Sequence, residues 1–114
     1  KLDNLCVIVD NNGLQIDGRV DDICSPGDIA QKFRAFGFHV ISIDGHDFSQ
    51  IEAAFAQARQ TKGMPSAIIA KTIKGKDVSF MEDNGAWHAP NAEQYEIAMN
   101  DLKAVQEALE GPRA

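Results

Sequence analysis

Short apolar runs alternate with stretches of helical periodicity along most of this chain, and that alternation limits the fold more than any other feature. The runs are short and contain β-branched residues, as strands do, and the first and third have the character of strands buried on both faces. They occupy residues 5–9, 38–43 and 66–71. Between them, residues 27–36 and 48–61 carry apolar residues at the three- or four-residue spacing of an α-helix. The order strand, helix, strand, helix, strand predicts right-handed crossovers and a parallel sheet with flanking helices, the α/β fold class.

Residues that cap helices mark the expected helix starts. Ser25 and Pro26 have the chemistry of an N-cap followed by proline in the first turn, so the first helix is expected to begin there. Residues 19–24, just before them, are polar and acidic and predict a surface loop. Asp47 is expected to cap the second helix, and His46 beside it is expected to have a structural role in the turn.

The last part of the chain begins with residues 72–90, which have no clear period. A connection of this length in a compact domain is generally either functional or disordered. Helical periodicity returns over residues 91–110, where Asn91 and Gln94 have the spacing of a capping box. Three parallel strands leave two open sheet edges, and few helices are available to cover them. Residues 1–114 are therefore predicted to form one partial domain.

The composition narrows the possible partners. A net charge of −6 over 114 residues argues against a surface for nucleic acid or for an anionic membrane. No apolar run approaches the roughly 20 residues that cross a bilayer. Two cysteines do not make a disulfide framework, and Cys6 in the first apolar run is expected to be a small buried hydrophobe. These features predict a cytoplasmic protein with neither nucleic acid nor membrane as a partner.

The first apolar run ends in Asp10, Asn11 and Asn12, which are followed by Gly13. This cluster falls at the carboxyl end of a predicted strand, where open α/β sheets bind their ligands. Its side-chain oxygens suit a hard cation such as Mg²⁺ or Ca²⁺, and the glycine lets the backbone turn tightly toward the same ion. Asn-Asn-Gly is also a common turn that binds nothing, and both interpretations remain open from these residues alone.

Two further segments are candidates for the same site. The turn at residues 72–75 follows the third predicted strand, and His88 lies in the long connection after it. In a parallel sheet the ends of the first and third strands open on the same edge. The nearby basic side chains suit either phosphate binding or a solvated loop. His88, considered by itself, also fits a loop histidine that contacts only solvent. The basic residues are Lys71, Lys74 and Lys76.

Several spaced blocks resemble transketolases, in the same order along the chain. The block at residues 9–18 looks like the second half of their thiamine diphosphate motif. The blocks read VDNNGLQIDG (9–18), FRAFGFHV (33–40), DGHD (44–47) and KTIKG (71–75). Residues 78–82, with Trp87 and His88, resemble the amino-terminal subunit of split transketolases in particular. The resemblance extends from Lys1 to about Leu102, nearly the whole chain.

The resemblance implies a role for individual residues. The side-chain oxygen of Asn12 and the backbone carbonyl of Leu14 would bind Mg²⁺ or Ca²⁺, which in turn would bind the cofactor diphosphate. Ile16 and Ile73 would form apolar walls of the thiamine site. His88 would approach the diphosphate and the reaction centre as a hydrogen-bond donor or proton shuttle.

At the level of the whole protein, the resemblance implies part of an enzyme that transfers a two-carbon ketol unit between sugar phosphates in the pentose phosphate pathway. The chain would be the carboxyl-terminal portion of the thiamine diphosphate-binding domain, since the Gly-Asp-Gly half of the family motif would precede Lys1. The glutamate that activates the cofactor would belong to the pyrimidine-binding, carboxyl-terminal transketolase subunit. We therefore expect a homo- or hetero-oligomer, and the isolated chain should be inactive.

Two alternatives accompany this interpretation. One is another thiamine diphosphate enzyme, such as a deoxyxylulose-phosphate synthase, although residues 16–18 favour transketolase. The other is a non-catalytic oligomerisation or binding module, favoured by the absence of Gly-Asp-Gly. The chain also departs from split transketolases where His88 runs directly into Ala89 and Pro90, because those proteins tend to carry Gly-Lys between the histidine and Ala-Pro.

Overall fold

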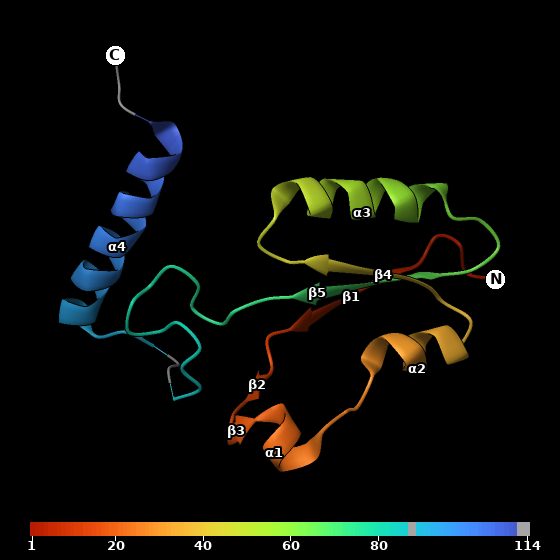
Figure 1. Cartoon of the computed structure of the whole chain (residues 1–114), viewed down its shortest axis with the longest axis horizontal. Helices are drawn as coiled ribbons and strands as arrows, with labels where there is room; N and C mark the ends of the chain where they lie inside the picture. The colour runs from red at the N-terminus through yellow and green to blue at the C-terminus, as the bar shows by residue number, and fades with distance from the viewer. Residues whose placement is uncertain (87–88, 112–114) are drawn as a thin grey trace.

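A computed structural model describes residues 1–86 and 89–111 of the chain. Its centre is a parallel sheet of β1 (Cys6–Asn11), β4 (His39–Asp44) and β5 (Ser66–Lys71), in the order β1-β5-β4. Helix α2 (Ile29–Ala35) covers one face, and α3 (Phe48–Gln60) covers the other (Figure 1). The predicted α/β fold with a parallel sheet and flanking helices is confirmed.

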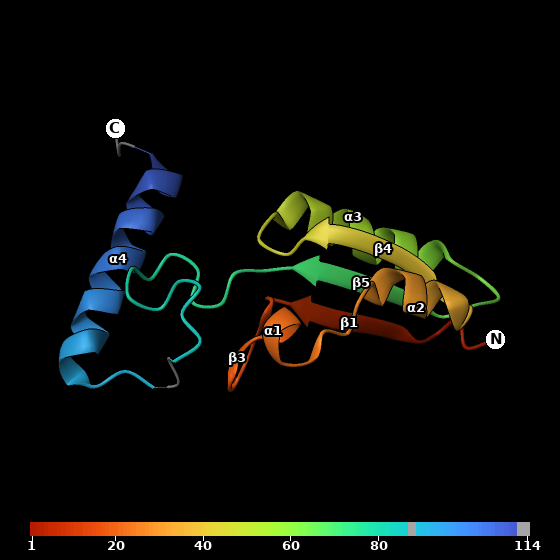
Figure 2. The same cartoon turned by 60° about the horizontal axis from the view of Figure 1, so that its bottom comes forward.

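The strand order explains why the helices lie on opposite faces. From β1 the chain passes through α2 to β4 at the far edge, and then returns through α3 to β5 in the middle (Figure 2). Parallel crossovers are almost always right-handed, so reversing the direction of travel across the sheet moves the connecting helix to the other face. The result is a three-layer arrangement with β5 at its centre.

The core lies where β5 meets β4 and α3. Ile68 of β5 is only 2% exposed and clusters with Ile41 of β4 and with Ala54 and Ala58 of α3. All residues from Ser66 to Ala70 are buried, as the apolar run predicts. The central strand therefore has the two-sided burial that is expected of a strand in a parallel sheet.

Strand β1 differs from β5 in its burial. Ile8 is 56% exposed, and Cys6 is exposed as well, so the expected burial of both faces of this run is wrong for this structure. The physical reason is position in the sheet: β1 is an edge strand, and both helices pack mainly on β4 and β5. Sequence periodicity reports that a strand is apolar but not whether a neighbour covers it.

The segment after β1 contains small elements that the sequence pattern missed. β2 (Leu14–Gln15) and β3 (Gly18–Arg19) form an antiparallel hairpin. The acidic stretch predicted to be a loop is instead the short helix α1 (Val20–Cys24). Acidic residues in its first turn, Asp21 and Asp22, are favourable beside the positive end of the helix dipole.

The start of α2 also differs from the prediction. The helix begins at Ile29, and its N-cap is Asp28, whose side chain accepts a hydrogen bond from the Gln31 amide at 2.8 Å. Ser25 does not cap this helix: its hydroxyl accepts from the Gly27 amide at 3.2 Å and donates to the Asp21 carboxylate at 2.6 Å. Both residues have capping chemistry and lie only three positions apart, so residue type alone does not identify the cap.

Helix α4 (Ala92–Glu110) stands away from the sheet in both views (Figures 1 and 2). Its predicted capping box is present, with Asn91 and Gln94 each accepting from the other's backbone amide at 2.9 Å. The amide and hydroxyl of Ser79 donate to Asp101 on this helix at 2.9 and 2.7 Å, which lowers the pKa of that carboxyl. In the described residues, no helix has the length and apolar character needed to cross a membrane.

The 114-residue chain is expected to self-associate as its concentration rises, because β1 and β4 are open edges and large apolar side chains such as Phe36 and Phe48 are exposed. Sedimentation velocity at several concentrations measures this directly. An Ile8→Lys variant should associate less, since a charge on an edge strand opposes strand pairing. A monodisperse monomer with a sharp, cooperative thermal transition would contradict the prediction.

Candidate functional site

The three parallel strands end side by side at one edge of the sheet. Asn11, Lys71 and Asp44 are register partners at the ends of β1, β5 and β4. Two cavities open at this edge: a larger one of about 700 Å³, and a smaller one of about 510 Å³. Both are lined by Asn11, Lys71, Thr72 and Ile73. The prediction that the ends of the first and third strands meet is confirmed.

Thr72 ties the ends of β1 and β5 together. Its amide donates to the Asn11 carbonyl at 3.3 Å, and its hydroxyl donates to the carboxylate of Asp10. These bonds extend the pairing of the two strands past the end of the sheet. As a result, the polar cluster after β1 and the turn after β5 form one surface although they are far apart in sequence.

Asn12 lies in the turn that follows β1 and lines the smaller cavity with Gly13. Its half-buried side chain accepts a hydrogen bond from the Leu14 amide at 2.9 Å, an Asx turn. Gly13 has a φ of 73°, a left-handed conformation that glycine adopts without strain. Asn-Asn-Gly therefore forms a turn, and its hydrogen bond holds the Asn12 amide oxygen in a defined orientation at the cavity.

The other predicted cofactor residues lie at different depths. Ile73 is 38% exposed and lines both cavities. Leu14 is half-buried in β2, and Ile16 is 82% exposed at the tip of the β2–β3 hairpin. The structure thus brings Asn12 and Ile73 to one cavity, whereas Leu14 and Ile16 lie in the adjoining hairpin.

The predicted catalytic residue, His88, lies outside the described residues. The segment that leads toward it returns to the hairpin, because a Cβ placed on Gly85 would be 3.8 Å from Leu14 Cδ2. Arg19 of β3 also pairs with Asp83 at 2.5 Å. The connection after β5 therefore folds back against the turn that carries Asn12.

The basic side chains near the site have different environments. Lys76 Nζ lies 3.0 Å from Asp77 and 3.7 Å from Glu82, and the hydrogen bond and charge of Asp77 chiefly raise the pKa of that amine. Lys74 Nζ donates to the Gly85 carbonyl at 3.4 Å. These two lysines contribute to the structure of the loop, and Lys76 also lines the larger cavity, while Lys71 lines both cavities.

The turn between β4 and α3 also contributes to the edge. Asp47 caps α3 as predicted, and its hydrogen bonds, chiefly with Gln50, lower the pKa of its carboxyl. His46 lines the larger cavity, and its Nε2 accepts a hydrogen bond from the Ile73 amide at 2.8 Å. The sequence places His46 at a strand end, but the bond to Ile73 depends on strand order, which local periodicity does not report.

The oxygen donors near Asn12 fit part of the metal site that the sequence resemblance implies. In residues 1–86 and 89–111, no cluster of three His, Cys, Asp or Glu side chains is arranged to hold a metal ion. The Asn12 amide oxygen has two lone pairs, and the Leu14 amide uses one of them. Amide and carbonyl oxygens are ligands that Mg²⁺ and Ca²⁺ accept, so these residues fit as part of a coordination shell that other groups complete.

Proteins similar in sequence to this chain include subunits of transketolases. The chain is 38% identical over 112 residues to one subunit of the apulose-4-phosphate transketolase of Phocaeicola vulgatus, covering 96% of this chain and 40% of that protein. It is 46% identical over 88 residues to the 6-deoxy-6-sulfo-D-fructose transketolase subunit SqwG of a Clostridium species, covering 77% of this chain and 32% of that protein. The chain thus spans well under half the length of these relatives.

A solved structure and a family model also match transketolases. The transketolase of Campylobacter jejuni superposes with a TM-score of 0.82 at 34% sequence identity, covering 90% of this chain and 16% of that one. The family model described as "Transketolase, thiamine diphosphate binding domain" matches residues 1–108. Since that match includes the sheet, both cavities and most of α4, the chain belongs to the family of transketolase thiamine diphosphate-binding domains.

Proposed function

We propose that this chain is part of a transketolase-type transferase that moves a two-carbon ketol unit between sugar phosphates. The observation that carries the proposal is the meeting of Asn12 and Ile73, remote in sequence, at one cavity on the carboxyl edge of the sheet. The relatives named above are transketolases or their subunits, which favours this function over a deoxyxylulose-phosphate synthase. Sugar phosphates are the proposed substrates, and the pentose phosphate pathway is the proposed setting.

In this proposal the chain supplies part of the site for the metal and the cofactor diphosphate. The Asn12 amide oxygen and the Leu14 carbonyl bind Mg²⁺ or Ca²⁺, and the ion neutralises the diphosphate beside an apolar sheet. The hydrogen bond from the Leu14 amide holds the Asn12 side chain in place before the ion arrives. When bound, thiamine diphosphate supplies the nucleophilic carbon and the electron sink for the carbon–carbon bond chemistry.

The remaining site residues are proposed to shape the cavity and to move a proton. Ile73 and Ile16 exclude water from the thiamine site as apolar walls, and the exposure of both fits residues that a ligand or another part of the enzyme covers. His88 donates a hydrogen bond to the diphosphate or shuttles a proton at the reaction centre. The return of the described part of this connection toward the hairpin supports this role, because a Cβ placed on Gly85 would lie 3.8 Å from Leu14 Cδ2.

The chain is further proposed to work within a larger assembly in the cytoplasm. It corresponds to the carboxyl-terminal portion of the cofactor-binding domain, with residues 1–114 forming one partial domain. The remaining metal ligand comes from outside residues 1–114. The glutamate that activates the cofactor comes from a pyrimidine-binding, carboxyl-terminal subunit in a homo- or hetero-oligomer. The limited coverage of the relatives and the open edges of β1 and β4 support this incompleteness.

The test of this function is an Asn12→Ala variant in the assembled enzyme. It is expected to weaken Mg²⁺ and thiamine diphosphate binding together, by about tenfold or more, because a metal ligand is lost. Isothermal titration calorimetry measures both affinities. Asn11→Ala is the matched control and should have a smaller effect, since the Asn11 backbone carbonyl accepts from Thr72 and survives the substitution. Unchanged affinity of the Asn12 variant for both ligands would remove Asn12 from the site and favour the non-catalytic binding module.

A further inference from the structure

We infer that His46 is a positioning residue for the proposed cofactor site, holding Ile73 in place through the backbone amide of Ile73. The inference rests on the proposed function, since it concerns the apolar wall that Ile73 forms there. The Ile73 amide donates to His46 Nε2 at 2.8 Å. A nitrogen that accepts a hydrogen bond carries no proton, so the neutral ring has its proton on Nδ1.

The approach of the two turns explains how His46 reaches this amide. Gly45 donates its amide to the Lys71 carbonyl at 2.7 Å, continuing the pairing of β4 with β5 beyond the strand ends. A Cβ placed on Gly45 would lie 2.5 Å from Thr72 Cγ2 and 3.1 Å from the Lys71 carbonyl oxygen. Only glycine permits so close an approach, and it brings the following residue, His46, next to Ile73.

Ile73 lies between two sets of contacts at this edge. On one side, His46 accepts from its amide. On the other, the preceding residue Thr72 donates to the Asn11 carbonyl and to the carboxylate of Asp10, next to the turn of Asn12. A displacement of Ile73 therefore changes the walls of both cavities. Losing the histidine acceptor leaves the Ile73 amide without this partner and frees the turn to move.

The charge of the His46 ring decides whether the bond exists, because an imidazolium ring has only donors. Charged residues that line the same cavity as His46 are Asp44, Lys71 and Lys76. Asp47, the next residue in sequence, caps α3. The Asp44 carboxylate accepts from the His46 backbone amide at 2.9 Å and so orients the turn that carries the ring.

The test compares His46→Leu with His46→Gln in the assembled enzyme at saturating Mg²⁺. Calorimetry should show thiamine diphosphate binding weakened by about three- to tenfold in the leucine variant, the range for one lost hydrogen bond. The glutamine variant should bind nearly as the parent does, because its amide oxygen can replace Nε2 as acceptor. Hydrogen exchange of the Ile73 amide should accelerate in the leucine variant.

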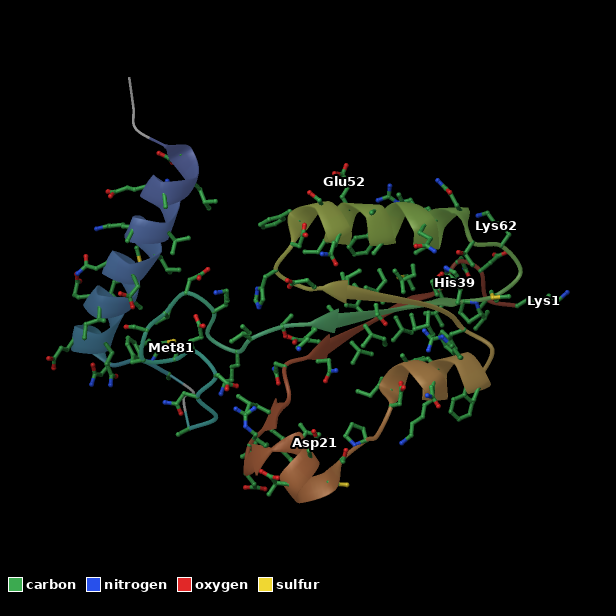
Figure 3. All side chains as sticks on the ribbon, viewed as in Figure 1. Lys1, Asp21, His39, Glu52, Lys62 and Met81 are labelled. Carbon is green, nitrogen blue, oxygen red and sulfur yellow. The ribbon has the colours of Figure 1, made fainter. Side chains whose placement is uncertain are left out.

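His39→Leu is the matched control. His39 Nε2 lies 2.9 Å from Gln57 Nε2 at the amino-terminal end of β4, on the side of the sheet where Lys1 and Lys62 lie (Figure 3). The same chemical change there should leave cofactor affinity unchanged. If His46→Leu fails to fold, His46→Gln is compared with His46→Asn, whose amide is one carbon shorter and should not restore the bond to Ile73.

The outcomes separate the inference from the proposed function. Parent-like affinity in His46→Leu, or equal weakening in the leucine and glutamine variants, overturns the role of His46 as an acceptor. If Asn12→Ala weakens binding while His46→Leu does not, only the inference fails. If neither variant changes binding, the proposed cofactor site fails as well.

Discussion

Replacing Ile68 with alanine is expected to lower the free energy of unfolding of the 114-residue chain by about 3 kcal/mol. Ile68 is the largest fully buried side chain in the described residues, at 2% exposure, and it lies on the central strand. The substitution removes three carbon atoms and leaves a cavity against Ile41, Ala54 and Ala58. Small side chains on α3 offer little that could collapse into the space, so the loss includes both transfer and cavity terms.

The matched control for Ile68 is Ile8→Ala, because Ile8 is its register partner on β1. Ile8 is 56% exposed, so the same change should cost well under half as much. Urea denaturation, monitored by circular dichroism, measures the change in the free energy of unfolding for both variants. If alanine at position 68 abolishes the cooperative transition, Ile68→Val should retain it, at a cost of about 1 kcal/mol. Equal costs at positions 8 and 68 would show that β1 is covered in solution and is not an edge.

The His88→Ala substitution is expected to lower the turnover number of the assembled enzyme by roughly 10²-fold, if proton transfer is the main task of this residue. A group that only binds the diphosphate stabilises every state alike, whereas a proton shuttle acts chiefly in the transition state. The measurement is made at saturating thiamine diphosphate and Mg²⁺, so that weakened binding is not mistaken for slower chemistry. Turnover per folded, loaded enzyme is the quantity to compare.

His39→Ala serves as the control for His88. His39 lies at the amino-terminal end of β4, away from both cavities, and contacts Gln57 on α3. Its loss should therefore affect stability and leave turnover near that of the parent. Normal turnover in the His88 variant would remove that residue from the chemistry. It would also indicate that the direct junction of His88 with Ala89 and Pro90 has moved the loop relative to its position in split transketolases.

Capping residues in the sequence correctly predicted where two of the helices begin. Asp47 begins α3, and the reciprocal bonds of Asn91 and Gln94 begin α4, because a capping side chain needs partners only three residues away. The same rules misplaced the start of α2, where Ser25 and Asp28 both have capping chemistry and the structure uses Asp28. Short elements such as α1 and the β2–β3 hairpin contain too few residues to show a period.

The sequence by itself determined the three strands of the parallel sheet, the longer helices and the oxygen-rich turn at Asn12, since each depends on residues close together along the chain. The helical segments between the strands then implied parallel strands. Only the tertiary structure decided that β5 lies between β1 and β4, that Ile8 is exposed while Ile68 is buried, and that His46 accepts from the amide of Ile73. Strand order results from packing between segments tens of residues apart, and hydrophobic periodicity contains no information about which neighbour a strand receives.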